Sequence, residues 1–197
     1  MNNLILLTLV FLLLVMQRYF ILSTLKNPAN SHAPPLKDKG FDLLPHLHSP
    51  IYSFFIDVLL YSSLILVFFC LGKKQINLFL ISTLYIHLIR FICLFVTRLP
   101  HSGLNCQNSN NVWTKIKSNE CTTDYIFSGH TSTLLLSLLH LREIYPDYNV
   151  LFMVLFTVFV YLTIATRNHY SVDVVLAIVV TYCVYVIVGL KHKKVIV

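Results

Sequence analysis

Charged residues are scarce in this sequence. They make up 12% of the 197 residues, while 56% are hydrophobic, whereas a soluble domain carries roughly 25% charged residues. This scarcity excludes a water-soluble globular protein and indicates an integral membrane protein. Internal repeats and low-complexity tracts are not evident either, so repetition does not define the organisation of the chain.

A basic face suited to nucleic acid is also missing. The net charge is +7, but the basic residues are scattered through short loops and tails and are not gathered on a surface studded with aromatic residues. We therefore exclude nucleic acid as a partner.

Apolar runs of about 20 residues, the length of a spanning helix, occur six times. We expect membrane helices at about 4–24, 51–71, 76–98, 126–144, 149–166 and 171–190. These spans and their loops use all of residues 1–197. The sequence therefore predicts an all-α integral membrane protein with a single domain, a bundle of six transmembrane helices.

The first apolar run lacks the marks of a signal peptide. No positive charge precedes it, no small-residue cleavage site follows, and the apolar run resumes after Gln17 and Arg18. A signal peptide would carry both marks. We expect the run to be retained as a membrane helix.

Positive charge indicates the orientation of the bundle. Basic residues flank helix ends in three short segments: Lys73 and Lys74, Arg142, and Lys191, Lys193 and Lys194. The opposite loops, about 26–50 and 99–125, spread a similar number of basic residues over far more chain. Dense positive charge is typical of the cytoplasmic side, which predicts that both termini are cytoplasmic.

Two polar motifs interrupt the apolar sequence. SGHT contains His130 at the start of the fourth span, and RNHYSVDV contains Arg167, His169 and Asp173 at the start of the sixth. Segments four and five cross twice, so the second motif returns to the membrane face where the first lies. Two histidines, a carboxylate and an arginine on one face are suited to attack on phosphorus, which indicates chemistry on a phospholipid.

His169 and Asp173 are four residues apart and share a face if they lie on one helix. A carboxylate bonded to one ring nitrogen fixes the tautomer, leaves the other nitrogen free to attack and stabilises the imidazolium. The alternative is that Asp173 caps the sixth helix and that His169 is interfacial. Because a carboxylate near a bilayer is costly, we favour the functional interpretation.

Three further features are candidates for phosphate binding. Gly129 at a helix start lets backbone N–H groups approach an anion, and Ser128 is also suited to cap that helix. Arg167 offers a fork of donors to phosphate, although an interfacial anchor is an alternative. Arg90 lies inside the third span, where an arginine indicates function; a structural pair with Asp57 is the alternative.

Cys106 and Cys121 lie in one loop on the outer side. In an oxidising lumen they would close a disulfide, which we favour, while two free thiols stay open as an alternative. His46 and His48 form an HxH pair, which alone is weak evidence for a metal, and the two cysteines do not complete a zinc-ligand spacing with it.

The motifs resemble those of a known family. CTTDYIFSGHT (Cys121–Thr131) and RNHYSVDVVLA (Arg167–Ala177) are similar to the two active-site motifs of the sphingomyelin synthase family, within the wider lipid phosphate phosphatase superfamily. RFICLFVTRLP (Arg90–Pro100), followed by Cys106, resembles a preceding family motif. PPLKDKGFDLLPHL (Pro34–Leu47) resembles its proline-rich motif more loosely.

The resemblance implies His169 as nucleophile, Asp173 as its orienting carboxylate and His130 as acid and base. It also implies transfer of a phospho-headgroup (phosphocholine, phosphoethanolamine or phosphoinositol) from a glycerophospholipid donor to ceramide, through a phosphohistidine and with release of diacylglycerol. The expected site faces the lumen or cell exterior, in the Golgi or plasma membrane, with no metal or other cofactor. Headgroup and oligomeric state stay open.

The sequence differs from the motifs of this family and its superfamily at two places. Cys93 stands where the family tends to have a threonine, and the lysine–arginine–proline motif of the superfamily's phosphatases is missing ahead of His130. The second departure favours a transferase. A lipid phosphate phosphatase, with water as acceptor, and a non-enzymatic membrane protein are the alternatives.

Overall fold

The computed structural model describes residues 3–25, 36–97 and 126–194, and these residues form helices joined by short links. The helices are α1 (Asn3–Leu25), α2 (Lys39–Leu43), α3 (Pro50–Cys70), α4 (Lys73–Val96), α6 (Gly129–Ile144), α7 (Asn149–Ala165) and α8 (Ser171–Lys194), with a 3₁₀ turn (Pro146–Tyr148) before α7.

Polar residues cap the start of several helices, and α3 is one example. The Ser49 side chain accepts a hydrogen bond from the N–H of Ile51, and Pro50 occupies the first turn of α3. Both are preferred at these positions, because serine satisfies an unpaired N–H and proline has none to satisfy. Each of the two motif-bearing helices, α6 and α8, also begins with a capped turn.

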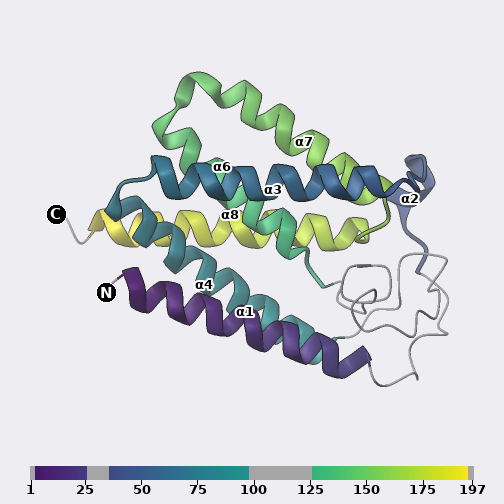
Figure 1. The fold of residues 1–197 in the computed structure, drawn as a ribbon, viewed down its shortest axis with the longest axis horizontal. Helices are drawn as coiled ribbons and strands as arrows, with labels where there is room; N and C mark the ends of the chain where they lie inside the picture. Colours follow the sequence, from purple (N-terminus) through teal and green to yellow (C-terminus); the bar gives the residue numbers. More distant parts are fainter. Residues whose placement is uncertain (1–2, 26–35, 98–125, 195–197) are drawn as a thin grey trace.

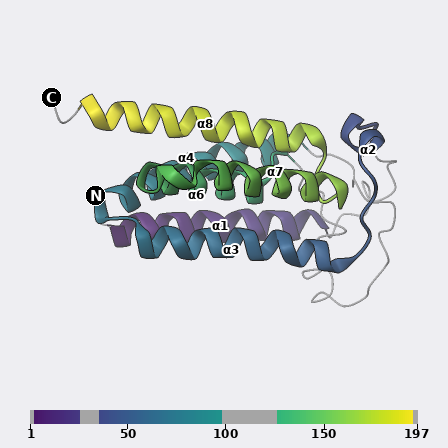
Figure 2. The same ribbon diagram turned by 90° about the horizontal axis from the view of Figure 1, so that it is seen from above.

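Among the described residues, the long helices are α1, α3, α4, α6, α7 and α8. They lie side by side, and successive ones run in opposite directions (Figures 1 and 2). α6 is central and packs against α3, α4, α7 and α8, whereas α1 packs against α4. Both termini lie at one end of the bundle, and α2 lies at the other (Figure 1). The start of α6 and the link between α7 and α8 lie at the α2 end, so the two polar motifs come to the same end, as predicted.

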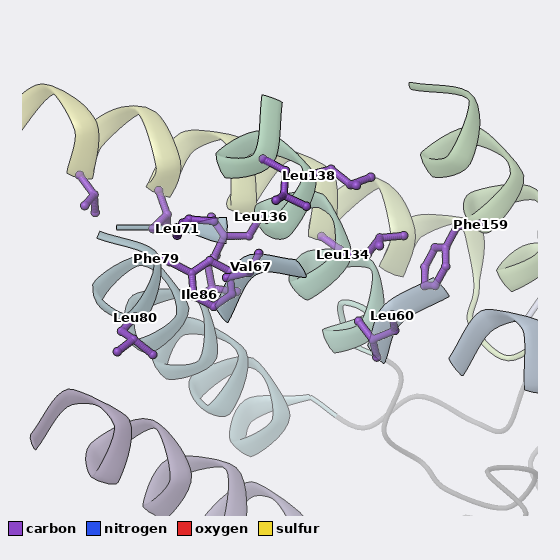
Figure 3. Packing of buried hydrophobic residues seen from close by; sticks show 14 of the residues in the cluster. Leu60, Val67, Leu71, Phe79, Leu80, Ile86, Leu134, Leu136, Leu138 and Phe159 are labelled. Atoms are coloured by element: carbon purple, nitrogen blue, oxygen red, sulfur yellow. The ribbon is translucent and has the colours of Figure 1, made fainter. Parts of the chain in front are cut away.

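The buried core is largely aliphatic with a few phenylalanines, and most of it lies between α3, α4, α6 and α8. Val67, Phe79, Ile86, Leu134 and Leu136 are among its members (Figure 3). Large apolar side chains also cover the outside of the helices, where they are exposed. A chain that is apolar both inside and outside is suited to a bilayer, since lipid accepts the outward-facing side chains.

Five of the described helices are long and apolar enough to cross a membrane: Asn3–Ile21, Pro50–Cys70, Lys73–Val96, Pro146–Ala165 and Ser171–Leu190. The chain is thus a multi-pass membrane protein. α6 is not among them, so the prediction of six spans is not confirmed within the described residues.

The physical reason lies in the surroundings of α6. It has 16 residues, about 24 Å at 1.5 Å per residue, against about 30 Å of hydrocarbon. Four helices surround it, and it buries Thr131, Ser132, Ser137 and His140. A helix that contacts protein on most sides does not need the uniform apolar surface that lipid imposes.

Candidate active site

The two polar motifs are in direct contact. The backbone N–H of Ser128 donates to the backbone carbonyl of Asp173 over 3.2 Å. Both residues are fully buried. The start of α6 is therefore joined to the first turn of α8, although the two residues lie far apart in the sequence.

Ser128 is the N-cap of α6, and its side chain accepts from the N–H of Thr131 over 3.2 Å. The capping interpretation of Ser128 is thus confirmed. His130 follows in the first turn and is only partly buried. The positive end of the helix dipole lies at this turn, so the turn is suited to receive an anion beside His130.

Arg90 is buried beneath the start of α6. Its Nε donates to the carbonyl of Phe127 over 3.1 Å, and its Nη1 donates to Oε1 of Gln17 over 3.1 Å. A Cβ on Gly129 would stand 3.3 Å from that Nε and 3.4 Å from Cζ. Glycine therefore permits the close approach of the guanidinium to the motif, and a cation stands at the end of the helix that attracts anions.

Gln17 is a member of this network that the sequence analysis missed. It lies on α1 with 2% of its surface exposed, accepts from Arg90 and donates its Nε2 to the carbonyl of His87. The sequence signal that could have identified Gln17 is an isolated amide side chain beside Arg18 in an otherwise apolar run. The suggested pairing of Arg90 with Asp57 stays a prediction.

The link between α7 and α8 holds His169 in a tight turn. Arg167 has a φ of 56°, in the left-handed region that non-glycine residues seldom adopt. Its N–H donates to the carbonyl of Ile164 over 2.9 Å, closing the end of α7. The Arg167 guanidinium lies 4.9 Å from the centre of the Phe41 ring of α2, within the range of a cation–π contact.

His169 is buried at the inner side of this link. Burial lowers its pKa well below 6.5, and the nearby charges of His130 and then Arg90 lower it further. Desolvation and like charges both disfavour the imidazolium. His169 is therefore neutral at physiological pH, the form in which a ring nitrogen is a nucleophile.

Asp173 caps α8. Its Oδ2 accepts from the N–H of Tyr170 over 3.0 Å, the backward half of a capping box. The capping interpretation is thus confirmed, and it is compatible with a second role because a carboxylate has two oxygens. The carboxylate is buried in the same short segment as His169, the two motif residues being four apart.

His46 and His48 follow α2, with ring centres 3.6 Å apart. Burial, then the neighbouring His48, then Arg167 lowers the pKa of His46, so His46 is mainly neutral at pH 7. Within the described ranges no group of three or more His, Cys, Asp or Glu side chains is arranged to hold a metal ion.

The cysteines divide between described and undescribed segments. Cys70, Cys93 and Cys183 are free thiols. Cys106 and Cys121 lie outside the described residues, so their disulfide stays a prediction.

Comparison with known proteins shows what the chain is similar to. Residues 120–190, which contain both histidine motifs, match the PAP2 superfamily C-terminal family. The chain is also similar to phosphatidylcholine:ceramide cholinephosphotransferase 2 of Macaca fascicularis, with 28% identity over 185 residues. The human protein of the same name is 27% identical over 185 residues. Each comparison covers 78% of this chain and 49% of the relative.

The resemblance to the sphingomyelin synthase family is thereby confirmed. The chain spans about half the length of the curated relatives that it matches.

Proposed function

We propose that this protein transfers a phospho-headgroup from a glycerophospholipid to ceramide and releases diacylglycerol. The observation that carries the proposal is the bond between Ser128 and Asp173, which joins the two histidine motifs at one end of the bundle. A relative whose name includes a glycerophospholipid, phosphatidylcholine, and ceramide supports the proposal.

The first half of the reaction uses His169 as nucleophile. A ring nitrogen attacks the donor phosphorus, and a nitrogen–phosphorus bond replaces the bond from phosphorus to the diacylglycerol oxygen. His130, entering as imidazolium, gives its proton to the departing oxygen. The neutral state of His169, produced by burial and nearby positive charge, supports this assignment.

The second half returns the enzyme to its starting state. Neutral His130 takes the proton of the primary hydroxyl of ceramide, whose oxygen attacks the phosphohistidine. The nitrogen–phosphorus bond breaks, and His169 leaves as neutral imidazole. A group that gives and then takes a proton works best with a pKa near the operating pH, which suits histidine.

The charged surroundings of His169 stabilise the reaction. Asp173 orients the imidazole and stabilises the charge that it acquires when it attacks. The guanidinium of Arg90, the N–H groups that follow Gly129, and Arg167 stabilise negative charge on the phosphoryl oxygens. The lowering of the His169 pKa by Arg90 supports an electrostatic role for that residue.

We further propose that the end of the bundle with α2 faces the lumen or exterior, in the Golgi or plasma membrane. Both termini lie at the opposite end (Figure 1), as cytoplasmic termini require. The dense basic segments of the sequence support this orientation.

A second candidate, a lipid phosphate phosphatase, would use water in place of ceramide. The match to the PAP2 superfamily favours it. The matched residues contain the histidine motifs, which both reactions would use, and the match does not distinguish ceramide from water as the acceptor. Incubation of the purified protein with fluorescent ceramide and mixed phospholipids separates the two. A ceramide-linked headgroup with equal diacylglycerol supports the transferase, and a phosphate product that forms without ceramide contradicts it. The variant His130→Ala is the inactive control.

A further inference from the structure

Asp38 connects the segment before α3 to the catalytic end of α8. Its Oδ2 accepts from the backbone N–H of Ser171 over 2.7 Å, and its Oδ1 accepts from the Ser171 hydroxyl over 2.6 Å. The same Oδ1 accepts from the N–H of Gly40 over 2.8 Å, which starts α2. One carboxylate thus holds two segments that are 133 residues apart in the sequence.

Ser171 is the first residue of α8 and lies two residues after His169. Its N–H has no partner within the helix, because the first turn of a helix leaves its N–H groups unpaired. Asp38 satisfies that group with a negative charge, while Asp173 satisfies the N–H of Tyr170. Two carboxylates from distant segments therefore occupy the positive end of α8, where negative charge is favoured.

Other contacts of the α2 segment surround the same link. The N–H of Leu36 donates to the Tyr170 hydroxyl over 3.1 Å, and the Phe41 ring stacks on the Tyr170 ring with centres 5.5 Å apart. Further along, the N–H of Leu47 donates to the carbonyl of Ala165 over 2.9 Å. The segment holds the link both before and after His169.

Gly40 shows how closely α2 approaches the link. A Cβ at this position would stand 2.0 Å from the Ser171 hydroxyl oxygen and 3.0 Å from Cγ2 of Ile164. A side chain here would displace either α2 or the Ser171 hydroxyl from its bond to Asp38. The sequence KDKG therefore provides both the carboxylate and the space for its bonds.

We propose that Asp38 is a positioning residue for the reaction: through Ser171 it fixes the link that aims the His169 ring. The inference rests on the proposed role of His169 but assigns Asp38 no contact with substrate. Misplacement of a reacting group by about 1 Å costs on the order of 100-fold in rate. Loosening the link therefore lowers kcat and leaves KM nearly unchanged.

The test compares Asp38→Asn with Asp42→Asn. Both variants lose one carboxylate from α2, but the Asp42 side chain is exposed, whereas Asp38 holds Ser171. We expect Asp38→Asn to lower kcat by about 10- to 100-fold with KM changed less than about 2-fold, and Asp42→Asn to match the wild type. An unchanged kcat in Asp38→Asn, or a rise in KM alone, overturns the proposal.

Two further variants keep the test decisive if Asp38→Asn fails to fold. Ser171→Ala removes the hydroxyl bond and retains the N–H bond, so it should lower kcat by about 3- to 10-fold, on the order of one typical hydrogen bond. Gly40→Ala should lower kcat at least as much, and Gly189→Ala, where a Cβ meets nothing within 4 Å, is its control. Wild-type kcat in Ser171→Ala overturns the proposal.

Amide hydrogen exchange of peptides covering 166–173 separates this inference from the proposed function. We expect faster exchange there in Asp38→Asn and wild-type exchange in Asp42→Asn, with or without any catalytic activity. If the wild-type protein shows no headgroup transfer to ceramide, only the proposed function is contradicted. If amide exchange in Asp38→Asn equals that of the wild type, only the positioning role of Asp38 is contradicted.

Discussion

The backbone N–H of Ser128 and the backbone carbonyl of Asp173 are 3.2 Å apart. This bond between the start of α6 and the first turn of α8 brings the histidine of each motif to a common site. It uses backbone atoms of both residues, so side-chain substitutions at either position leave this connection chemically possible. The side chains proposed as catalytic can therefore be tested without removing the bond that joins the two motifs.

Asp173→Asn should lower transfer by at least about 100-fold. The amide loses the charge that stabilises an imidazolium and presents an N–H₂ where an acceptor is needed, which favours the wrong tautomer of His169. Steady-state kcat with fluorescent ceramide measures the effect. A kcat equal to that of the wild type would show that Asp173 only caps the helix.

Gly129→Ala should lower kcat by about 10-fold or more. The added Cβ would stand 3.3 Å from Nε of Arg90, so either the guanidinium or the start of α6 must move, and His130 moves with the helix. Gly72→Ala is the matched control, because its nearest atom, Oε1 of Gln75, is 3.4 Å away at the terminus of a flexible side chain. Equal kcat in the two variants would contradict the close approach.

Gln17→Leu should lower the free energy of unfolding by about 2 kcal/mol, because a buried guanidinium N–H loses an acceptor that leucine cannot replace. Thermal unfolding in detergent measures the change. The control is Thr8→Ala on the exposed face of the same helix, where the hydroxyl bonds only to the carbonyl of Leu4. Unfolding of Gln17→Leu at the wild-type temperature would contradict the structural role of the amide.

The pH profile should reflect the lowered pKa of His169. The folded protein holds His169 neutral below pH 6.5, so kcat/KM should persist below 6.5 and fall only as the pH drops through the folded pKa. The free energy of unfolding has the same pH dependence. His169 takes up its proton at a higher pH in the unfolded chain than in the folded protein, so the free energy of unfolding decreases as the pH falls below 6.5. Measurement of kcat/KM for the phospholipid donor from pH 4 to 9 checks this, because the attack by His169 belongs to that half of the reaction. An acid limb centred at 6.5 or above would contradict it.

Much of the site could be predicted because alternation of spans determines which loops share a membrane face. His130 and His169 come together for that reason, although only five of the described helices are long and apolar enough to cross a membrane. The exception, α6, shows the limit of the reasoning, since apolar length in the sequence does not reveal that four helices enclose it.

The supporting residues could not be predicted in this way. Asp38 and Ser171 are 133 residues apart, and Gln17 and Arg90 are 73 apart. Each pair forms only because particular segments pack together in a particular register. The local sequence pattern predicts neither the packing partners nor the register. Asp173 shows a different limit, because the same side chain caps a helix and has a second oxygen for the role proposed at His169, so the two interpretations of the sequence are not exclusive.

The nucleophilic role of His169 is the central claim, and trapping the intermediate tests it most directly. The protein is mixed with phosphatidylcholine labelled at phosphorus, without ceramide, quenched, digested and analysed by mass spectrometry. We predict a headgroup phosphate on the peptide containing His169, lost on addition of ceramide and missing in His169→Ala. An adduct on His130, or full transfer by His169→Ala, would contradict the account.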